Sequence, residues 1–280
     1  MVIDGKQIAQ SILDSLKGRV QELEEGGITP HLAVILVGDD ESSKAYVRQK
    51  ELKVNEIGAA ITIRRFKSNF SEAELLQLIS ELNDDPIVHG IIVQRPLPPQ
   101  IDRNKITEAT NSDKDVDGFC ENTLFDAPVA LAVWRILKEI HRTSGDQELS
   151  LEDWVKSKNI AIIGKGQTAG MPIIKFFDRK NLPLDVIHSK TEDKNEKIKN
   201  ADILITAVGK ENVVKGEMLK SGTILLGVGM GRGEDGKIHG DYNEEDVSTF
   251  AGFYTPVPGG VGPVNVAMLL SNLLKAAENN

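Results

Sequence analysis

The sequence predicts an α/β protein of two domains, each built on a parallel sheet. Strand-length runs of β-branched residues alternate with helical stretches along most of the 280 residues. The alternation lapses once, in the polar stretch 111–123, and a glycine-rich turn later joins a strand directly to a helix. At ~100–200 residues per domain, the length also fits two domains.

The first set of elements precedes the polar stretch. Three strands are expected at 31–37, 60–66 and 89–93, and helices at 6–25, 42–57 and 71–83. A further helix is expected over 128–141, followed by an exposed turn at 142–148.

The second set alternates in the same way. Strands are expected at 159–163, 184–188, 202–207 and 222–228, and helices at 168–180 and 193–200. The loop 253–263 then holds three prolines and three glycines, which favours a site over a linker. A last helix carries one apolar stripe, formed by Val266, Leu269, Leu270, Leu273 and Leu274.

Composition excludes several classes of protein. With 33 Lys+Arg against 42 Asp+Glu, the net charge of −9 argues against nucleic acid as a partner. The single cysteine, Cys120, excludes a disulfide framework and a multi-thiolate metal site. Apolar runs are too short to span a bilayer, and the opening residues show no signal pattern. We therefore expect a cytoplasmic protein that does not bind a membrane.

The glycine-rich turn Gly164-Lys165-Gly166-Gln167-Thr168-Ala169 predicts a dinucleotide site. The first glycine permits the tight turn, the second lets the backbone approach a pyrophosphate, and the small third residue allows close packing of helix on strand. A purely structural turn is the alternative. The next strand ends in His188, Ser189 and Lys190, which donate to phosphate, so NADP is favoured over NAD.

Small residues close two later strands. Ala207, Gly209 and Val228 are candidate cofactor contacts, because ligands of parallel sheets lie beyond the carboxyl ends of strands. Tight structural turns explain them equally well.

Five residues of the first half could carry chemistry. Tyr46 and Lys50 share one helix face, where a lysine shielded by an aromatic ring could lose its charge and act as a base. An ordinary surface pair is the alternative. Gln94 is fixed at a strand tip by the prolines that follow. Asp115 and Asp117 are expected to point in opposite directions in an extended segment, and one could bind an amino-heterocycle. A metal loop is disfavoured, since no further ligands follow at EF-hand spacing.

Together these segments resemble the bifunctional methylenetetrahydrofolate dehydrogenase/cyclohydrolase family. The matching stretches, in the family's order, are 46–50, 90–98, 114–119, 164–172 and 255–263. The resemblance implies a cytoplasmic homodimer with a cleft between a folate-holding domain (1–120, completed by 262–280) and a Rossmann-type NAD(P)-binding domain (121–254). It implies that methylenetetrahydrofolate is oxidised to the methenyl form, which is then hydrolysed to 10-formyltetrahydrofolate.

The resemblance also implies residue roles. Lys50 is the catalytic lysine, Tyr46 stacks on the folate, Gln94 hydrogen-bonds Lys50, and Asp117 anchors the pterin amino group. The implied folate contacts are Tyr46, Lys50, Val93, Gln94, Pro96, Leu97, Asp117, Pro258, Gly259 and Gly260. The implied cofactor contacts are Gly164, Lys165, Gly166, Gln167, Thr168, Ser189, Lys190, Ala207, Gly209 and Val228.

The chain departs from the family pattern at several positions. They are Arg95, the segment 128–131, Lys165 and Gly166 of the glycine turn, Gly227, and Val264 with Asn265. These changes bear on cofactor choice and on the balance of the two activities. The alternatives are a member with one activity, a non-catalytic folate or nucleotide binder, and an unrelated NADP-dependent dehydrogenase.

Overall fold

In the computed structural model, which describes residues 1–145, 148–233 and 236–279, the chain forms two compact units. The three-stranded unit comprises Gln10–Pro128 and Val266–Asn280, and the five-stranded unit comprises Met1–Ala9 and Val129–Asn265. The predicted α/β class with parallel sheets is confirmed.

The three-stranded unit is a parallel sheet in the order β2-β1-β3. Its strands are β1 (His31–Val37), β2 (Ala60–Phe66) and β3 (Gly90–Val93). Six residues of β1 are buried, because this central strand is covered on both faces. All three strands run in one direction, so their carboxyl ends share one edge of the sheet.

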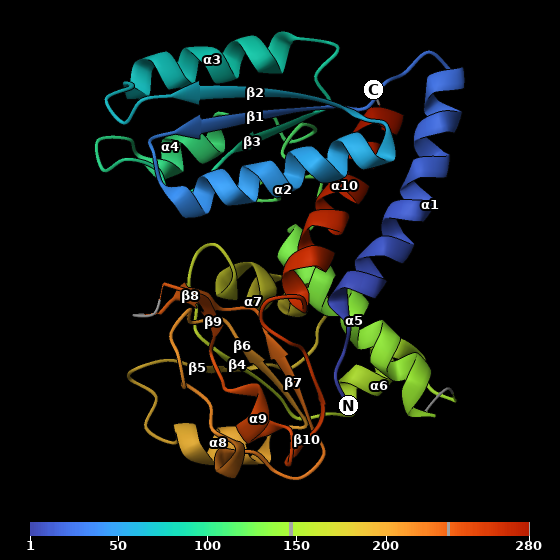
Figure 1. Ribbon diagram of the computed structural model, residues 1–280, viewed down its shortest axis with the longest axis vertical. Coiled ribbons are helices and arrows are strands. Elements are labelled where there is room, and N and C mark those ends of the chain that lie inside the picture. Colours follow the sequence, from blue (N-terminus) through green and yellow to red (C-terminus); the bar gives the residue numbers. More distant parts are fainter. Residues whose placement is uncertain (146–147, 234–235, 280) are drawn as a thin grey trace. The chain divides into compact units, whose positions relative to one another are not determined.

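Helices cover both faces of this sheet. Figure 1 shows α2 (Glu41–Ile57) and α3 (Glu72–Asp84) on opposite sides of it. Leu75 and Ile79 of α3 pack with Ala33 and Ile35 of β1 on one face. Ser71 and Glu74 form a reciprocal capping box that fixes where α3 begins. The remaining helical segments are α1 (Gly5–Glu25), α4 (Arg103–Glu108) and α10 (Val261–Asn279), of which α1 and α10 each extend from one unit into the other.

The five-stranded unit is a parallel sheet in the order β10-β7-β6-β4-β5. Its strands are β4 (Ile160–Ile163), β5 (Asp185–Ile187), β6 (Ile203–Thr206), β7 (Thr223–Gly227) and β10 (Ala251–Tyr254). Strands β8 (Met230–Arg232) and β9 (Ile238–Gly240) form a separate antiparallel pair. The helices are α5 (Pro128–Ser144), α6 (Leu151–Lys156), α7 (Gly170–Arg179), α8 (Lys194–Asn200) and α9 (Glu244–Val247), with a 3₁₀ turn at Gly216–Met218.

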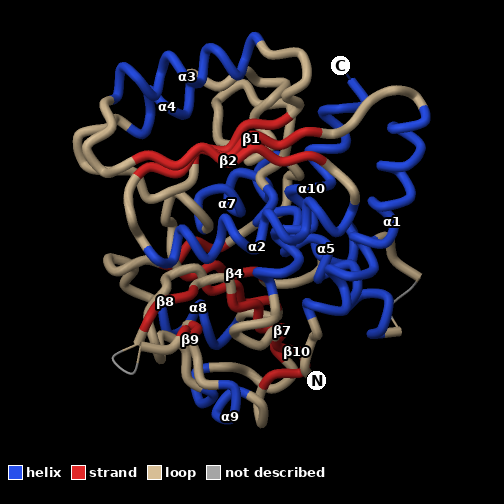
Figure 2. Tube along the Cα trace, turned by 45° about the horizontal axis from the view of Figure 1, so that its top comes forward, coloured by secondary structure: helices blue, strands red, loops and turns tan. Residues whose placement is uncertain are grey.

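The two faces of this sheet are covered by different helices. In Figure 1, α7 lies on one side of the sheet while α8 and α9 lie on the other. On the second side, Ile198 of α8 and Val247 of α9 pack with Leu204 and Leu225 of the strands. The alternation of helix and strand along the chain is visible in Figure 2.

The first residues of the chain belong to the five-stranded unit. Val2 forms a parallel bridge with Tyr254, and the backbone N–H of Ile3 donates to the Tyr254 carbonyl at 2.8 Å. The terminal ammonium of Met1 donates to the Gly252 carbonyl at 2.7 Å. The chain therefore extends the hydrogen bonding at the β10 edge before it enters α1.

Several predicted elements shift or extend. Residues 142–144, expected in an exposed turn, continue α5, and the rest of that turn includes 146–147, which lie outside the described residues. Helix α7 begins at Gly170 rather than at 168, and α10 begins at Val261, inside the predicted loop 253–263. Pro263 is tolerated there because the first helical turn needs no N–H donor. No described helix is long and apolar enough to cross a membrane.

Candidate active site

Lys50 is held inside the three-stranded unit by the packing of α2. Asp40 caps the helix by accepting from the Ser43 N–H at 2.7 Å, and Val47, Val54 and Ile57 form its buried side. Lys50 is buried as well, at 7% exposure, and its Nζ donates to Gln94 Oε1 at 3.0 Å. The contact with Gln94 that the resemblance implies is present.

Burial favours the neutral amine form of Lys50. Removal from water disfavours the ammonium form and lowers the pKa of Lys50, while the negative charge of Asp117 partly opposes this. A lysine with a lowered pKa can hold a free amine and take up a proton.

The side chain of Gln94 is oriented by its own strand end. Its Nε2 donates to the Arg95 carbonyl at 2.8 Å, so its Oε1 is directed at Lys50. The hydroxyl of Ser43 on α2 also lies 3.2 Å from that carbonyl. Gln94 accepts from an N–H of Lys50 and not from its lone pair. When Lys50 is neutral, its lone pair is therefore free to accept a proton.

Tyr46 lies one helical turn before Lys50 on α2 and is half-buried. Burial raises the pKa of its phenol, so the ring carries no charge near neutral pH. A neutral ring suits stacking on a flat heterocycle.

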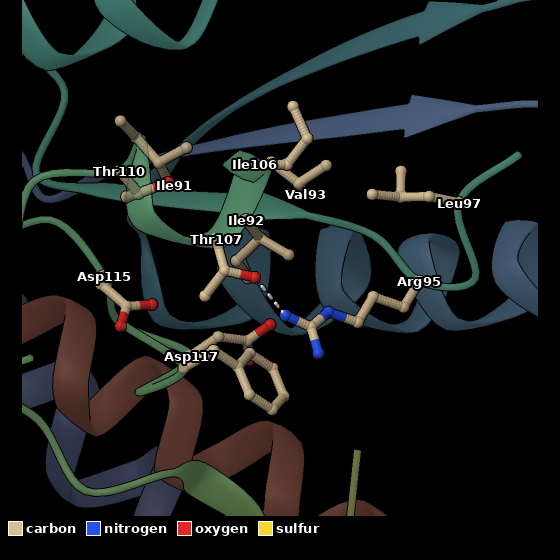
Figure 3. A pocket seen from close by; sticks show the side chains of 11 residues that line it. Ile91, Ile92, Val93, Arg95, Leu97, Ile106, Thr107, Thr110, Asp115 and Asp117 are labelled. Carbon is tan, nitrogen blue, oxygen red and sulfur yellow. Dashed lines mark hydrogen bonds between the residues drawn. The ribbon is translucent and has the colours of Figure 1, made fainter. Parts of the chain in front are cut away.

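A cavity lies at the carboxyl end of β3, and Figure 3 shows the side chains that line it. Ile91, Ile92, Val93, Leu97 and Ile106 supply apolar walls, and the polar groups are Arg95, Thr107, Thr110, Asp115 and Asp117. Of the predicted folate residues, Val93, Leu97 and Asp117 line it. Tyr46, Lys50, Gln94 and Pro96 do not, although Gln94 and Pro96 flank the lining residue Arg95 in the chain.

The expectation that Asp115 and Asp117 point in opposite directions is wrong. The backbone turns at this segment instead of extending, so both side chains line the same cavity (Figure 3). Asp115 accepts from the Cys120 N–H at 2.7 Å, which ties it to its own loop. Burial raises the pKa of Asp115. Asp117, half-buried, is the carboxylate whose charge acts on Lys50.

The glycine turn of the five-stranded unit follows β4. Gly164 has φ +100°, and a Cβ there would lie 2.5 Å from the Ala207 carbonyl oxygen, so only glycine fits. The closest approach of helix to turn lies at Gly170, where a Cβ would be 2.3 Å from the Gly164 oxygen. Gly170, and not Ala169 as expected, is therefore the small residue that allows the helix to pack closely on the turn.

This turn leaves room for a ligand. Lys165, Gly166, Gln167 and Thr168 are exposed, and nothing lies within 4 Å of a Cβ placed on Gly166. An open backbone in front of a helix N-terminus fits a pyrophosphate, so the residues present suit a dinucleotide cofactor.

The other predicted cofactor residues lie at the ends of neighbouring strands. Ala207 and Gly209 follow β6, and Val228 follows β7, with the Val228 N–H bonded to the Thr206 carbonyl at 2.8 Å. Ser189 and Lys190 follow β5 and are exposed. Pro258, Gly259 and Gly260 lie between β10 and α10, and a Cβ on Gly260 would meet the Pro256 oxygen at 2.6 Å.

A buried carboxylate that the sequence did not reveal holds this region. Asp241 is fully buried, at 0% exposure, and accepts three backbone N–H groups. They belong to Val208 at 3.0 Å, Gly209 at 2.7 Å and Lys210 at 3.0 Å. Asp241 thus fixes the turn after β6 from a residue more than thirty positions away.

The predicted residues therefore form one group in each unit. The three-stranded unit brings together Lys50, Gln94, Asp117 and the cavity wall. The five-stranded unit brings together the turns after β4, β6 and β7. Within the described part of the chain, no cluster of three or more His, Cys, Asp or Glu residues could hold a metal ion.

Comparison with known proteins covers both units. The catalytic-domain model of tetrahydrofolate dehydrogenase/cyclohydrolase matches residues 3–117, and the model of its NAD(P)-binding domain matches residues 146–280. A curated relative, the bifunctional protein FolD of Nautilia profundicola, is 39% identical over 99% of this chain and 97% of its own length. The chain belongs to the tetrahydrofolate dehydrogenase/cyclohydrolase family.

Solved structures of methylenetetrahydrofolate dehydrogenases, some of them also cyclohydrolases, are similar to this chain over nearly its full length. The bifunctional enzyme FolD from Campylobacter jejuni is 37% identical, with a TM-score of 0.91 over 100% of this chain and 99% of that one. The Trypanosoma brucei enzyme, solved with NADP cofactor and inhibitor, is 29% identical, with a TM-score of 0.88 over 100% and 97% of the two chains. The NAD-dependent enzyme from Saccharomyces cerevisiae is 19% identical, with a TM-score of 0.81 over 99% and 97%, and shows the fold alone.

Proposed function

We propose that this chain oxidises 5,10-methylenetetrahydrofolate to 5,10-methenyltetrahydrofolate with NAD(P)⁺ and hydrolyses the product to 10-formyltetrahydrofolate. The observation that carries the proposal is the buried Lys50 bonded to Gln94, in a chain similar over nearly its full length to bifunctional relatives. We assign the folate to residues 1–120 with 262–280, and the cofactor to 121–254.

The roles of the folate-site residues follow from their chemistry. Tyr46 presents a neutral ring for stacking, and Asp117 offers a carboxylate to the amino group of the pterin. Val93, Pro96 and Leu97, with Pro258, Gly259 and Gly260, are assigned to the walls of the folate site. The nicotinamide, when bound, accepts the hydride from the methylene carbon.

Hydrolysis is the step in which Lys50 has the larger part. The methenyl carbon is cationic, so a neutral amine nearby does not repel it as an ammonium ion would. As water adds and a new C–O bond forms, the free amine of Lys50 takes up the proton that water loses. The proton returns to N5 of the folate as its bond to the carbon breaks, and the hydroxyl group on the carbon loses its proton to solvent as the formyl C=O forms. Gln94 keeps Lys50 oriented throughout.

Substitution of Lys50 tests this assignment. Lys50→Met is expected to lower the rate of methenyltetrahydrofolate hydrolysis by at least about a hundredfold, since it removes the proton acceptor. Lys53→Met on the same helix is the matched control, because Lys53 is partly exposed and forms an ion pair with the nearby Glu56 at 2.6 Å. An unchanged rate in folded Lys50→Met would refute the lysine assignment.

For the cofactor, we propose the contacts already named in the turns after β4, β5, β6 and β7, with NADP preferred. Ser189 and Lys190 are exposed where the ribose 2′-phosphate would bind in this architecture. Lys190→Ala should raise KM for NADP and leave KM for NAD unchanged. A strong preference of the unmodified enzyme for NAD would contradict the assignment. We further propose that the protein is cytoplasmic and forms a homodimer. Sedimentation of the purified protein tests the dimer.

A further inference from the structure

A buried group of hydrogen bonds joins Tyr242 to Thr255 and Gly227 in the five-stranded unit. Tyr242 is 6% exposed, and Thr255 is fully buried, at 0%. The Tyr242 hydroxyl donates to the Thr255 carbonyl at 2.5 Å and lies 3.2 Å from the Thr255 hydroxyl. The N–H of Gly227, at the end of β7, donates to that same hydroxyl at 2.8 Å. None of these three residues is among the predicted folate or cofactor contacts.

The hydrogen atoms of this group can be assigned. Tyr242 has a single hydroxyl hydrogen, which it donates to the Thr255 carbonyl, so the Thr255 hydroxyl is the donor in the contact at 3.2 Å. The Thr255 N–H donates to the Leu225 carbonyl at 3.1 Å. All polar groups of Thr255 are therefore paired, and two of them, the carbonyl and the hydroxyl, depend on Tyr242. Burial raises the pKa of Tyr242, so its hydroxyl keeps the proton that it donates.

Gly227 leaves the space that the Tyr242 ring occupies. A Cβ on Gly227 would lie 2.8 Å from the Tyr242 hydroxyl oxygen and 3.0 Å from two ring carbons. The close approach of this ring, and not a left-handed backbone, therefore explains the glycine. Gly227 is also a departure from the family pattern, so Tyr242 reaches Thr255 through space that a larger side chain at 227 would fill.

Tyr242 is itself held in place. Its ring lies in a buried cluster with Leu225, and its backbone forms a parallel bridge with Val214. The preceding residue, Asp241, is bonded to three N–H groups of the turn after β6. A tyrosine that is fixed at its ring and at its backbone can hold Thr255 in turn.

Thr255 supports the loop 256–260. A Cβ on Gly260 would lie 2.6 Å from the Thr255 Cβ and 2.6 Å from the Pro256 oxygen, so the backbone of Gly260 packs directly on Thr255. Residues 258–260 are the part of the loop that we assign to the folate. A displacement of Thr255 therefore displaces the backbone that is assigned to folate binding.

We propose that Tyr242 is a positioning residue of the folate site, which fixes Thr255 and through it holds the loop 256–260 in the conformation that binds folate. The inference rests on the proposed function, since that function assigns the loop to the folate. Without the Tyr242 hydroxyl, two buried groups of Thr255 lose a partner and the loop gains other conformations. Because Lys50 is unchanged, the loss should appear in folate binding and not in the proton transfer that follows.

Matched variants separate the Tyr242 hydroxyl from the packing of its ring. Tyr242→Phe removes the hydroxyl alone, Thr255→Val removes its partner, and Thr255→Ser keeps that partner. Gly227→Ala leaves Tyr242 intact but crowds its hydroxyl away from Thr255. Tyr254→Phe is the control, because Tyr254 is buried in the same core cluster as Tyr242 and directly precedes Thr255.

The first measurement is the steady-state kinetics of methenyltetrahydrofolate hydrolysis. Tyr242→Phe, Thr255→Val and Gly227→Ala should each raise KM by roughly tenfold, the factor that one buried hydrogen bond supplies, and leave kcat within about twofold. Thr255→Ser and Tyr254→Phe should keep the KM of the unmodified protein. Gly227→Ala combined with Tyr242→Phe should raise KM no further than either change alone, because both remove the same contact.

The second measurement is hydrogen exchange of the amides of residues 255–260, followed by mass spectrometry, which needs no folate. Exchange should be faster in Tyr242→Phe and Thr255→Val and unchanged in Tyr254→Phe. If the unmodified protein does not hydrolyse methenyltetrahydrofolate, the proposed function fails, and hydrogen exchange still decides whether Tyr242 fixes the loop.

Three results would overturn the proposal. The first is an unchanged KM in folded Tyr242→Phe. The second is a rise in KM without faster exchange, because Tyr242 would then not act through the loop. The third is an equal rise in Tyr254→Phe, because general loosening of the core would then be responsible. If Tyr242→Phe does not fold, Thr255→Val supplies the same comparison.

Discussion

Asp241 offers the sharpest test of how the five-stranded unit holds its cofactor turns. Its carboxylate accepts the backbone N–H groups of residues 208–210 and has no access to water. Asp241→Ala would leave three partly buried N–H donors without this acceptor. A fully buried donor without a partner costs about 1–3 kcal/mol, and water can reach part of this turn, so the expected loss is roughly 2–4 kcal/mol.

Asparagine at this position gives a graded comparison. Oδ1 accepts from Gly209 and Lys210, and Oδ2 from Val208, so Asp241→Asn keeps two of the three bonds. It should lose about 1–3 kcal/mol, since one donor then faces an amide NH₂. Asp246→Asn is the control, because Asp246 is exposed and, among the described residues, accepts one N–H, from Gly216 at 2.8 Å.

Urea unfolding followed by tryptophan fluorescence measures these losses. Both tryptophans of the chain, Trp134 and Trp154, lie in the five-stranded unit, so the signal reports on the unit that contains Asp241. If Asp241→Ala unfolds within about 1 kcal/mol of the unmodified protein, the three hydrogen bonds do not have the importance assigned to them. A raised KM for the cofactor in Asp241→Asn would extend the argument to binding, since Ala207 precedes this turn and Gly209 lies in it.

Two more predictions concern titrating groups of the three-stranded unit. Burial lowers the pKa of both His31 and His89. The backbone N–H of His31 donates to Nδ1 of the His89 ring at 3.2 Å, so this ring nitrogen must carry no proton. The unfolded chain binds these protons more readily, so the stability present above about pH 6.5 should decline as pH falls. Hydrogen-exchange protection of β1 and β3, corrected for intrinsic exchange rates, should drop between pH 7 and 5. The drop should be smaller in His89→Asn, which lacks one of the two titrating rings. An equal drop in both proteins would contradict the assignment of the effect to His31 and His89. Burial also raises the pKa of Cys120, whose Sγ lies 2.9 Å from the Thr107 carbonyl, so a disulfide reagent should label it only in urea; rapid native labelling would contradict this.

Long, strongly patterned elements were predictable from the sequence. Strands β1 and β2 have the predicted bounds, because seven-residue β-branched runs between turn signals leave little choice. Several short elements without a clear pattern were not predicted: α4 has six residues with only Ile106 buried, and β8, β9 and β10 have three or four residues each. Such segments are set by tertiary contacts and show no periodicity of their own.

The candidate site was predictable where one element determines it. Tyr46 and Lys50 share a helix, and Gln94 ends a strand, so local pattern was enough to group them. Asp115 and Asp117 were misjudged because a turn, which spacing does not reveal, brings both into one cavity. Asp241 was missed since its three partners lie more than thirty residues away. The contacts of Arg95 with Thr107 and Phe119 were not predictable either, because they depend on how α4 and the following loop fold.

Each unit combines segments that lie far apart in the sequence, and this has a consequence during synthesis. The five-stranded unit needs Met1–Ala9 together with residues as late as Asn265, and the three-stranded unit needs the segment that begins at Val266. Asn272, for example, donates to the carbonyls of Val116 and Asp126. Many two-domain proteins complete their first domain on the ribosome before the second has emerged. Here the nascent chain cannot finish either unit until residues 265 and beyond have been translated, so its unpaired sheet edges depend longer on protection from aggregation.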